Sequence, residues 1–376
     1  MKTHVRMIAG ASVALALLAW SVGPTAAEEV PEQYRETVKK GLDYLAKTQF
    51  KDGHWGANGD QYPVSMTALA GIALLMEGST IREGKYSTQI RKAADWLMDR
   101  SMRGNQRDGL IGNPDHPTEA GRYMYGHGFS MLFLSCIYGD EEDRERRDKL
   151  RDILVRAVKY TANAQSSEGG WFYTSAAEGH NQDEGSVTVT QVQPLRAARN
   201  AGIPVPKAVI KKGYEYLKKC TTSRGGVVYS LGRGGIGAPA GGERPALTAA
   251  AIACLFSAGE YKDELCKKWF KYCQTAIPAG TGVRLGHDEY THFYFAQAVY
   301  ILGDDGWDKM FGPTAAGQKL TWSGYRQEMF DKLKQTQNAD GSWPSGGGFS
   351  VGPVYSTALY CTIMQLDKGT LPIFQR

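Results

Sequence analysis

Apolar residues recur at steps of three and four through several stretches of this chain, which is the pattern of an amphipathic α-helix. Tyr34, Val38, Leu42 and Leu45 share one helical face in this way. The pattern predicts helices at 34–48, 90–99, 150–164, 209–219, 265–273 and 325–335. Each of these stretches keeps a polar face, so we expect the six helices to form an outer, solvated layer.

A second set of stretches is apolar nearly all round. It comprises 65–76, 129–138, 248–257, 294–302 and 355–366. A helix without a polar face is buried on all sides, so these stretches predict an inner layer. Alternation of β-branched residues is scarce. The pattern therefore predicts an all-α protein with two helical layers.

A repeat of nearly sixty residues links the two sets. In three places a Gln precedes a Gly by four residues and a Trp by six. These pairs are Gln49 and Trp55, Gln165 and Trp171, and Gln337 and Trp343. The Gln residues are 116 and 172 residues apart, which is two and three units of 57 to 58. Glycine turns at 108–109, 224–227 and 280–283 lie near the missing positions. Six stacked two-helix units are therefore predicted, forming one domain over residues 28–376.

The first residues have the layout of a secretory signal peptide. Lys2 and Arg6 precede an apolar run at 7–22, and small residues at 25–27 offer a cleavage site before Glu28. A retained anchor is the alternative, but the run is shorter than the roughly 20 residues of a spanning helix. No later stretch is apolar for long enough to span a bilayer. We therefore expect an exported protein, periplasmic or extracellular, without a stable membrane span after cleavage.

Charge and cysteine content narrow the function only slightly. The formal charge is +5, or +3 without Lys2 and Arg6, and its basic residues are scattered. No nucleic-acid partner is indicated. The six cysteines include no Cys-x-x-Cys, which argues against a cysteine zinc cluster. Cys136, Cys254 and Cys361 lie in apolar runs and are predicted core thiols.

The signature, seen in full at residues 49–55, resembles the QW motif of squalene–hopene cyclases and other triterpene cyclases. The six hairpins are similar to those of protein prenyltransferase β-subunits. Residues 124–129 and 195–202 resemble short secreted bacterial proteins with prenyltransferase and squalene oxidase repeats. The resemblance implies an α/α toroid. It also implies structural roles for Gln49, Trp55, Gln165, Trp171, Gln337 and Trp343, in which Gln caps a neighbouring helix end and Trp stacks between repeats.

In a toroid, the N-terminal turns of the inner helices open toward one end. Polar and aromatic residues there are the candidates for a ligand cavity: Tyr125, His127, Thr188, Arg244, Asp288, Tyr290, His292 and Tyr294. Asp183 and Glu184 are weak catalytic candidates, because adjacent carboxylates raise one pKa. The alternative is that they only cap a helix N-terminus.

The motifs of the related enzymes are incomplete. The chain lacks the Asp-x-Asp-Asp-Thr-Ala acid of the cyclases and the Asp-x-Cys zinc ligands of the prenyltransferases. His287, Asp288 and His292 remain a loose set without a thiolate, so we expect no metal and no cofactor. The Asp-Asp-x-x-Asp pattern at 304–308 follows an inner helix and is predicted to be a solvated turn. The GxGxxG match at 232–237 lies in a loop and carries no weight.

Three functions stay open on this pattern. The first is an exported toroid that binds an apolar, isoprenoid-like small molecule or a protein partner. The second is a diverged terpene cyclase or prenyltransferase-type enzyme, an isomerase or transferase. The third is a polysaccharide-active toroid, which needs carboxylates and aromatic residues in an open cleft. Whether the protein is an enzyme is not decided by its motifs.

Overall fold

A computed structural model describes residues 29–231, 242–258, 263–280, 285–315, 317–345 and 351–375, and the statements below refer to these residues. The predicted signal peptide and the GxGxxG match lie outside them. The outer helices are α1 (Glu32–Thr48), α3 (Ser87–Met98), α5 (Arg144–Asn163), α7 (Lys207–Lys219), α9 (Glu264–Ala276) and α12 (Trp322–Thr336). The inner helices are α2 (Pro63–Met76), α4 (Tyr123–Ile137), α6 (Gly185–Asn200), α8 (Pro245–Ala258), α10 (Asp288–Leu302) and α13 (Pro353–Met364).

The six inner helices form a closed ring. Each packs against the next in the order α2, α4, α6, α8, α10 and α13, and α13 packs against α2. The described residues form isolated β-bridges but no strand. The predicted two-layer, all-α toroid of six hairpins is therefore confirmed. No described helix is long and apolar enough to cross a bilayer.

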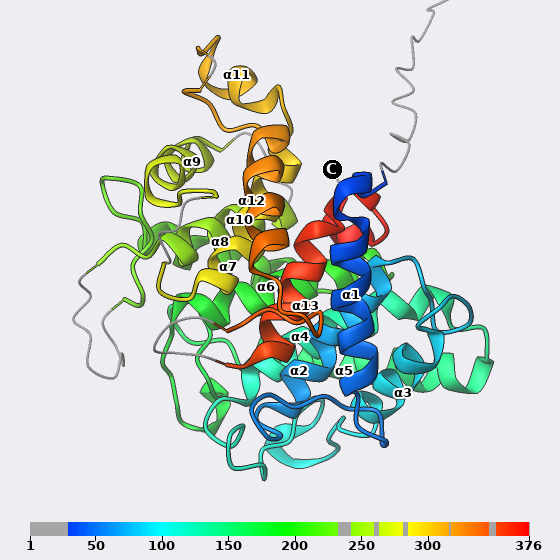
Figure 1. The fold of residues 1–376 in the computed structure, drawn as a ribbon. Coiled ribbons are helices and arrows are strands. Elements are labelled where there is room, and N and C mark those ends of the chain that lie inside the picture. The colour runs from blue at the N-terminus through cyan, green and yellow to red at the C-terminus, as the bar shows by residue number, and fades with distance from the viewer. Residues whose placement is uncertain are drawn as a thin grey trace, which may run out of the picture.

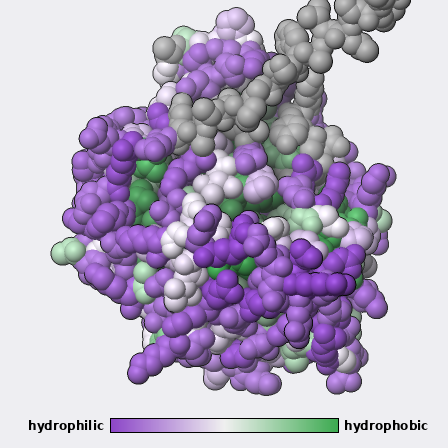
Figure 2. Space-filling view, turned by 90° about the vertical axis from the view of Figure 1, so that its right-hand side faces the viewer, coloured by the Kyte–Doolittle hydropathy of each residue, from purple (hydrophilic) through white to green (hydrophobic). Residues whose placement is uncertain are grey.

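Each outer helix packs mainly against the inner helix of the preceding repeat: α3 on α2, α5 on α4, α7 on α6, α9 on α8 and α12 on α10. The first outer helix, α1, packs on the last inner helix, α13, beside which it lies in Figure 1. The face drawn in Figure 2 is mainly hydrophilic, with hydrophobic residues visible only in small recesses. This agrees with the polar faces predicted for the outer helices.

The signature turns lock each repeat onto the next. All six turns carry a glycine with positive φ: Gly53, Gly109, Gly169, Gly225, Gly280 and Gly341. Each of these glycines lies directly against the next outer helix, and in five turns a Cβ would overlap a backbone carbonyl there. Glycine is required both for the left-handed backbone and for this close approach.

The signature Trp side chains are fully buried and cap outer helices. The indole N–H of Trp171 donates to the carbonyl of Thr161 at 2.7 Å, in the last turn of α5. Trp55 and Trp343 do the same for α1 and α12. Carbonyls in the last turn of a helix have no backbone N–H partner inside that helix. The Trp171 ring also packs against Gly213 of α7, so the predicted stacking between repeats is observed.

The signature Gln has a different role from the one that the resemblance implied. The side-chain amide of Gln165 donates to the carbonyl of Gly169 at 2.8 Å and to Val209, near the start of α7, at 3.0 Å. Orphan groups at a helix start are N–H donors, and an amide N–H cannot satisfy them. Gln therefore bridges neighbouring repeats, whereas Trp caps the helix end.

The end of the ring opposite the signature turns carries additional structure. The Asp-Asp-x-x-Asp stretch leads into a short helix, α11 (Gly306–Phe311), at the top of Figure 1. Asp308 is paired there with Lys319 at 2.6 Å, and Asp305 with Lys309 at 2.6 Å. The stretch is thus partly helical rather than a simple turn. It lies at the end predicted for it, away from the signature turns.

Candidate functional site at the mouth of the ring

One hydrogen bond recurs at the signature end of the ring, which we call the mouth. The backbone N–H of Trp171 donates to the hydroxyl of Thr188 at 3.0 Å, and equivalent bonds reach Thr67, Thr248 and Thr357. In the second repeat, His127 replaces the threonine. Its Nδ1 accepts from the N–H of Ile111 at 3.1 Å. Thr188 and His127 therefore sit in the wall of the mouth, with their polar atoms engaged in structural bonds.

His127 is held neutral. Its Nε2 lies 2.9 Å from the hydroxyl of Thr161, which itself donates to the carbonyl of Ala157. The imidazole must then accept at Nδ1 and donate at Nε2. Burial lowers the pKa of His127 to about 3. These contacts describe a packed histidine and not a general base.

The axis of the ring is crossed by direct contacts at three depths. At the mouth, the hydroxyl of Tyr290 on α10 donates to the carbonyl of Ser186 on α6 at 3.0 Å. Deeper, Gln193 of α6 and Gln297 of α10 share a 2.6 Å hydrogen bond. Between these two levels along α10, buried Phe374 of the C-terminal segment packs on Phe293. Helices α6 and α10 are therefore joined across the axis by hydrogen bonds at two levels.

Four half-buried tyrosines gather at the mouth around one buried carboxylate. We call Tyr125, Tyr173, Tyr229 and Tyr290 the tyrosine cluster. Tyr125 lies at the start of α4, with its ring 5.8 Å from that of Tyr173, and the hydroxyls of Tyr173 and Tyr229 are hydrogen-bonded. The carboxylate is Glu184, which is fully buried. Burial of the phenols, together with the charge of Glu184, raises their pKa values, so they are protonated donors at neutral pH.

Glu184 caps α6. It accepts from the backbone N–H groups of Val187 at 2.7 Å and Ser186 at 2.8 Å, and from the hydroxyl of Tyr125 at 3.2 Å. Burial raises the pKa of Glu184, although these hydrogen bonds oppose the rise. Its neighbour Asp183 accepts from the N–H of Leu231 at 3.2 Å. The capping alternative predicted for the pair thus describes Glu184, while Asp183 fixes a loop.

Ser186 joins Glu184 to the tyrosine cluster. Its hydroxyl lies 2.6 and 2.8 Å from the two oxygens of Glu184 and 2.5 Å from the hydroxyl of Tyr125. The side chain is half-buried. One turn along α10 from Tyr290, Tyr294 is fully buried, and its hydroxyl has no hydrogen-bond partner among the described residues. The floor of the mouth is therefore polar.

A second buried carboxylate lies at the start of α2. Glu119 comes from the loop before α4, and its Oε1 accepts from the N–H of Val64 at 3.0 Å. It is 2% exposed. Burial raises its pKa to about 7. This contact fixes the loop before α4 to the start of α2.

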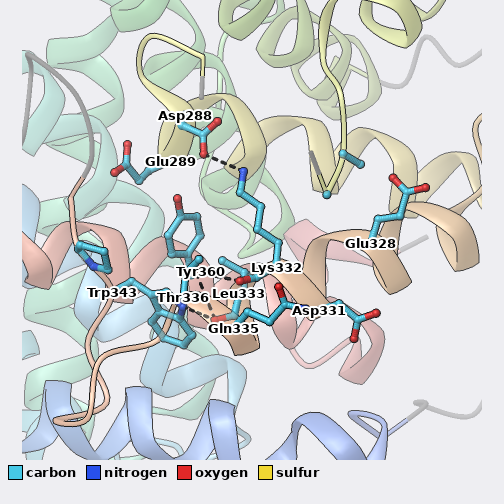
Figure 3. A pocket seen from close by; sticks show the side chains of 13 residues that line it. Asp288, Glu289, Glu328, Asp331, Lys332, Leu333, Gln335, Thr336, Trp343 and Tyr360 are labelled. Carbon is cyan, nitrogen blue, oxygen red and sulfur yellow. Dashed lines mark hydrogen bonds and ion pairs between the residues drawn. The ribbon is translucent and has the colours of Figure 1, made fainter. Parts of the chain in front are cut away.

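A recess of about 700 Å³ opens beside the mouth, between α10 and α12. Figure 3 shows Asp288 directed toward Lys332 across it, at 3.3 Å, with Trp343 and Tyr360 below. Asp288 also lies 3.5 Å from Nε2 of His292. Its pKa is lowered to about 2 by His292 and Lys332, against the effect of burial.

The structure places the predicted cavity residues in different parts of the mouth. Tyr125 and Tyr290 belong to the tyrosine cluster, with Tyr294 just below it. His292 is buried and bound to Tyr325 at 2.9 Å, in the register that His127 occupies in α4. Arg244 is exposed beside the start of α8. No group of three or more His, Cys, Asp or Glu among the described residues is placed to hold a metal ion.

Sequence reasoning missed several mouth residues. Tyr173 and Tyr229 each come two residues after the signature aromatic position and are 56 residues apart. Aligning the repeats would have found them. Ser186 was overlooked because it lies within the stretch assigned to Asp183 and Glu184. Glu119 carries no sequence signal, because its partner is on another helix.

Known proteins resemble this chain in fold and not in sequence. No family of known sequences matches it, and no curated protein does. An α-1,6-mannanase, GH76A of Salegentibacter sp. HEL1_6, inactivated at two adjacent aspartates and bound to α-1,6-mannotriose, superposes with a TM-score of 0.60 at 9% identity. The match covers 89% of this chain and 99% of the mannanase. The type II terpene cyclase MstE from Scytonema gives 0.56 at 14% identity over 90% and 99%. A protein from Actinoplanes gives 0.52 at 16% identity over 89% and 98%.

These likenesses show the fold alone. The chain is an α/α toroid of the kind found in both a glycan hydrolase and a terpene cyclase. It shares that architecture with these enzymes while differing from them at more than four of every five aligned positions.

Proposed function

We propose that the protein is an exported binding toroid whose mouth takes a carbohydrate. The observation that carries the proposal is the tyrosine cluster, four half-buried phenols around the buried Glu184. Tyrosine offers an apolar ring face and a hydroxyl together. A sugar presents the complementary surface, because its ring C–H groups pack on aromatic faces while its hydroxyls hydrogen-bond to phenols and carboxylates.

The direct contacts across the axis weigh against the apolar ligand favoured by the sequence. An isoprenoid needs a dry, apolar cavity that covers most of its surface. Here Tyr290 with Ser186, and Gln193 with Gln297, bridge the ring where such a cavity would lie. The recess beside the mouth is lined by Asp288, Glu289 and Lys332, which suits a hydroxyl-rich ligand better than a hydrocarbon.

The mouth and the recess share α10. Asp288 and Glu289 line the recess, and the next residue, Tyr290, belongs to the tyrosine cluster. A ligand longer than one sugar unit would therefore reach both. The likeness of the fold to a mannanase that binds α-1,6-mannotriose supports an oligosaccharide.

Isothermal titration of the mature protein with α-1,6-mannotriose, cello-oligosaccharides and chito-oligosaccharides tests the proposal. We expect one of these glycans to bind, and Tyr173→Ala to weaken its binding about tenfold, the effect of about 1.4 kcal/mol of lost contact. Tyr138→Ala is the matched control, because Tyr138 follows the opposite end of α4. Binding of geranylgeranyl or squalene analogues, with no glycan bound, would refute the proposal.

A further inference from the structure

Ser186 makes hydrogen bonds at the mouth that glycan binding does not explain. It is the second residue of α6, and its hydroxyl contacts both oxygens of Glu184 at 2.6 and 2.8 Å. We call the inner-helix residue that accepts the recurring hydrogen bond at the mouth the tie residue; it is Thr67 in α2 and Thr188 in α6. Ser65 lies two residues before Thr67, as Ser186 does before Thr188. Ser65 has no carboxylate contact of this kind among the described residues. The hydroxyl of Ser356 at the start of α13 also lies near a carboxylate, 3.4 Å from Oε1 of Glu289, but that contact is longer than those of Ser186 and involves one oxygen.

The pair has the geometry of a nucleophile and its base. A serine hydroxyl attacks an acyl group only when a base within hydrogen-bond reach removes its proton. Glu184 is held by the N–H groups of Ser186 and Val187, so its carboxylate cannot turn away. The pKa of Glu184 is raised by burial, which makes the carboxylate a stronger base than an exposed glutamate.

Tyr125 supplies a donor beside the nucleophile. Its hydroxyl is 2.5 Å from the Ser186 hydroxyl and stays protonated, because burial and the charge of Glu184 raise its pKa. The backbone N–H groups of the first turn of α6 are already engaged by Glu184 and Tyr229. The phenol is thus the group placed to donate to an oxygen that gains negative charge near Ser186.

We propose that Ser186 is the nucleophile of an esterase site, with Glu184 as its base and Tyr125 as the oxyanion donor. The substrate class is an acyl ester of an alcohol, and its assignment to O-acylated sugars rests on the proposed function. The site itself rests on the distances among the three residues.

The reaction balances with water as the only co-reactant. The Ser186 oxygen forms a bond to the acyl carbon while its proton passes to Glu184. The bond from the acyl carbon to the alcohol oxygen breaks, and that oxygen takes the proton from Glu184. Water then attacks the acyl-serine, giving its proton to Glu184. The serine oxygen leaves and recovers that proton, and the carboxylic acid is released.

A fluorophosphonate probe followed by intact mass and peptide mapping tests the nucleophile in the mature protein. We expect one adduct per chain at Ser186. With p-nitrophenyl acetate, we expect a hydrolysis rate at least about a hundredfold above that of Ser186→Ala. Ser65→Ala is the matched control and should keep the parent rate. No adduct, or equal rates for the parent and Ser186→Ala, would overturn the proposal.

Glu184→Gln separates a base from a cap. Glutamine keeps an acceptor for the N–H groups of α6 but cannot take a proton, so the fold should survive while hydrolysis is lost. The parent rate should rise with pH through a pKa above the ordinary range of glutamate. If a Glu184→Gln variant kept both the melting temperature and the hydrolysis rate of the parent, Glu184 would be a helix cap and not a base. Glycan binding without hydrolysis would remove this proposal alone, and hydrolysis without glycan binding would remove only the proposed ligand.

Discussion

The first, third and sixth repeats carry the complete signature, whereas the second, fourth and fifth keep only its glycine. Trp171 in the third repeat caps α5 and packs on the next repeat, while Val227 takes the equivalent place in the fourth. Both repeats nevertheless seat a positive-φ glycine against the following outer helix, and both tie their turn to an inner-helix threonine. The turn glycine is therefore common to all six repeats, whereas Trp and Gln reinforce only the first, third and sixth, of which the sixth and first are neighbours in the ring.

The strongest test of this comparison is Trp171→Ala against Val227→Ala. We expect Trp171→Ala to lower the free energy of unfolding by about 3 kcal/mol or more, since a fully buried indole and its cap are lost. Val227→Ala should cost about 1.5 kcal/mol, the value of two buried methyl groups. Urea denaturation measures both. Equal losses would show that the Trp adds nothing beyond its repeat position.

The next largest effect is expected at His127, the tie residue of the second repeat, and it is a dependence of stability on pH. The pKa of His127 is about 3 in the fold and near 6.5 in an unfolded chain. Its contribution to stability is therefore complete above pH 6.5 and is lost as the pH falls toward 3. Between pH 7 and pH 4 the loss should be about 3 kcal/mol.

His127→Thr copies the tie of the other repeats and should remove that part of the acid sensitivity. The comparison is the change in unfolding free energy between pH 7 and pH 4 in the variant and the parent. Identical changes in the two proteins would mean that His127 is not held neutral.

The contribution of Glu119, in the second repeat, to stability changes with pH in the opposite direction to that of His127. Burial raises its pKa to about 7, above the 4.5 of an ordinary glutamate. Its contribution is therefore favourable below pH 4.5 and is lost as the pH rises through 7. Glu119→Gln keeps an acceptor for Val64, and its stability relative to the parent should be about 3 kcal/mol higher at pH 8 than at pH 4. Thermal melts at the two pH values measure this, and a variant that loses stability at pH 8 would contradict it.

The smallest expected effect belongs to the signature Gln. Gln165→Ala removes one hydrogen bond within its own turn and one to the next repeat, and should cost about 1 kcal/mol. Exposed Gln335→Ala is the control and should cost nothing measurable. A loss as large as that of Trp171→Ala would reverse the ranking of the two signature residues.

The architecture could be predicted from the sequence because the same pattern recurs in every repeat, so that a clear unit indicates the structure of a less clear one. Periodicity alone predicts the helix that contains Tyr34, the helices before and after Trp171, and the six turn glycines. The mouth was harder to predict. His127 was among the predicted cavity residues because it lies in the first turns of an inner helix, whereas its hydrogen bond to Ile111 makes it a wall residue equivalent to Thr188.

Other parts had no local signal. Glu119 stabilises a helix 55 positions earlier in the chain, and only the folded path of its loop brings the two together. Phe374 lies beyond the last repeat, and nothing in its neighbours indicates that it packs on Phe293 of α10. Contacts of this kind depend on tertiary geometry that helical periodicity does not contain.

The docking of α1 on α13 has a consequence for the order of folding. Every other outer helix meets its inner partner within one repeat, but α1 must wait for a helix that begins about 300 residues later. Until α13 emerges, the apolar face of α1 has no surface to cover it. We therefore expect closure of the ring to be late and slow, since long-range contacts must overcome the entropy of the intervening chain. During synthesis, such a chain would stay an open arc that exposes an apolar helix face at each end, which is the state in which chaperones bind and neighbouring chains exchange repeats.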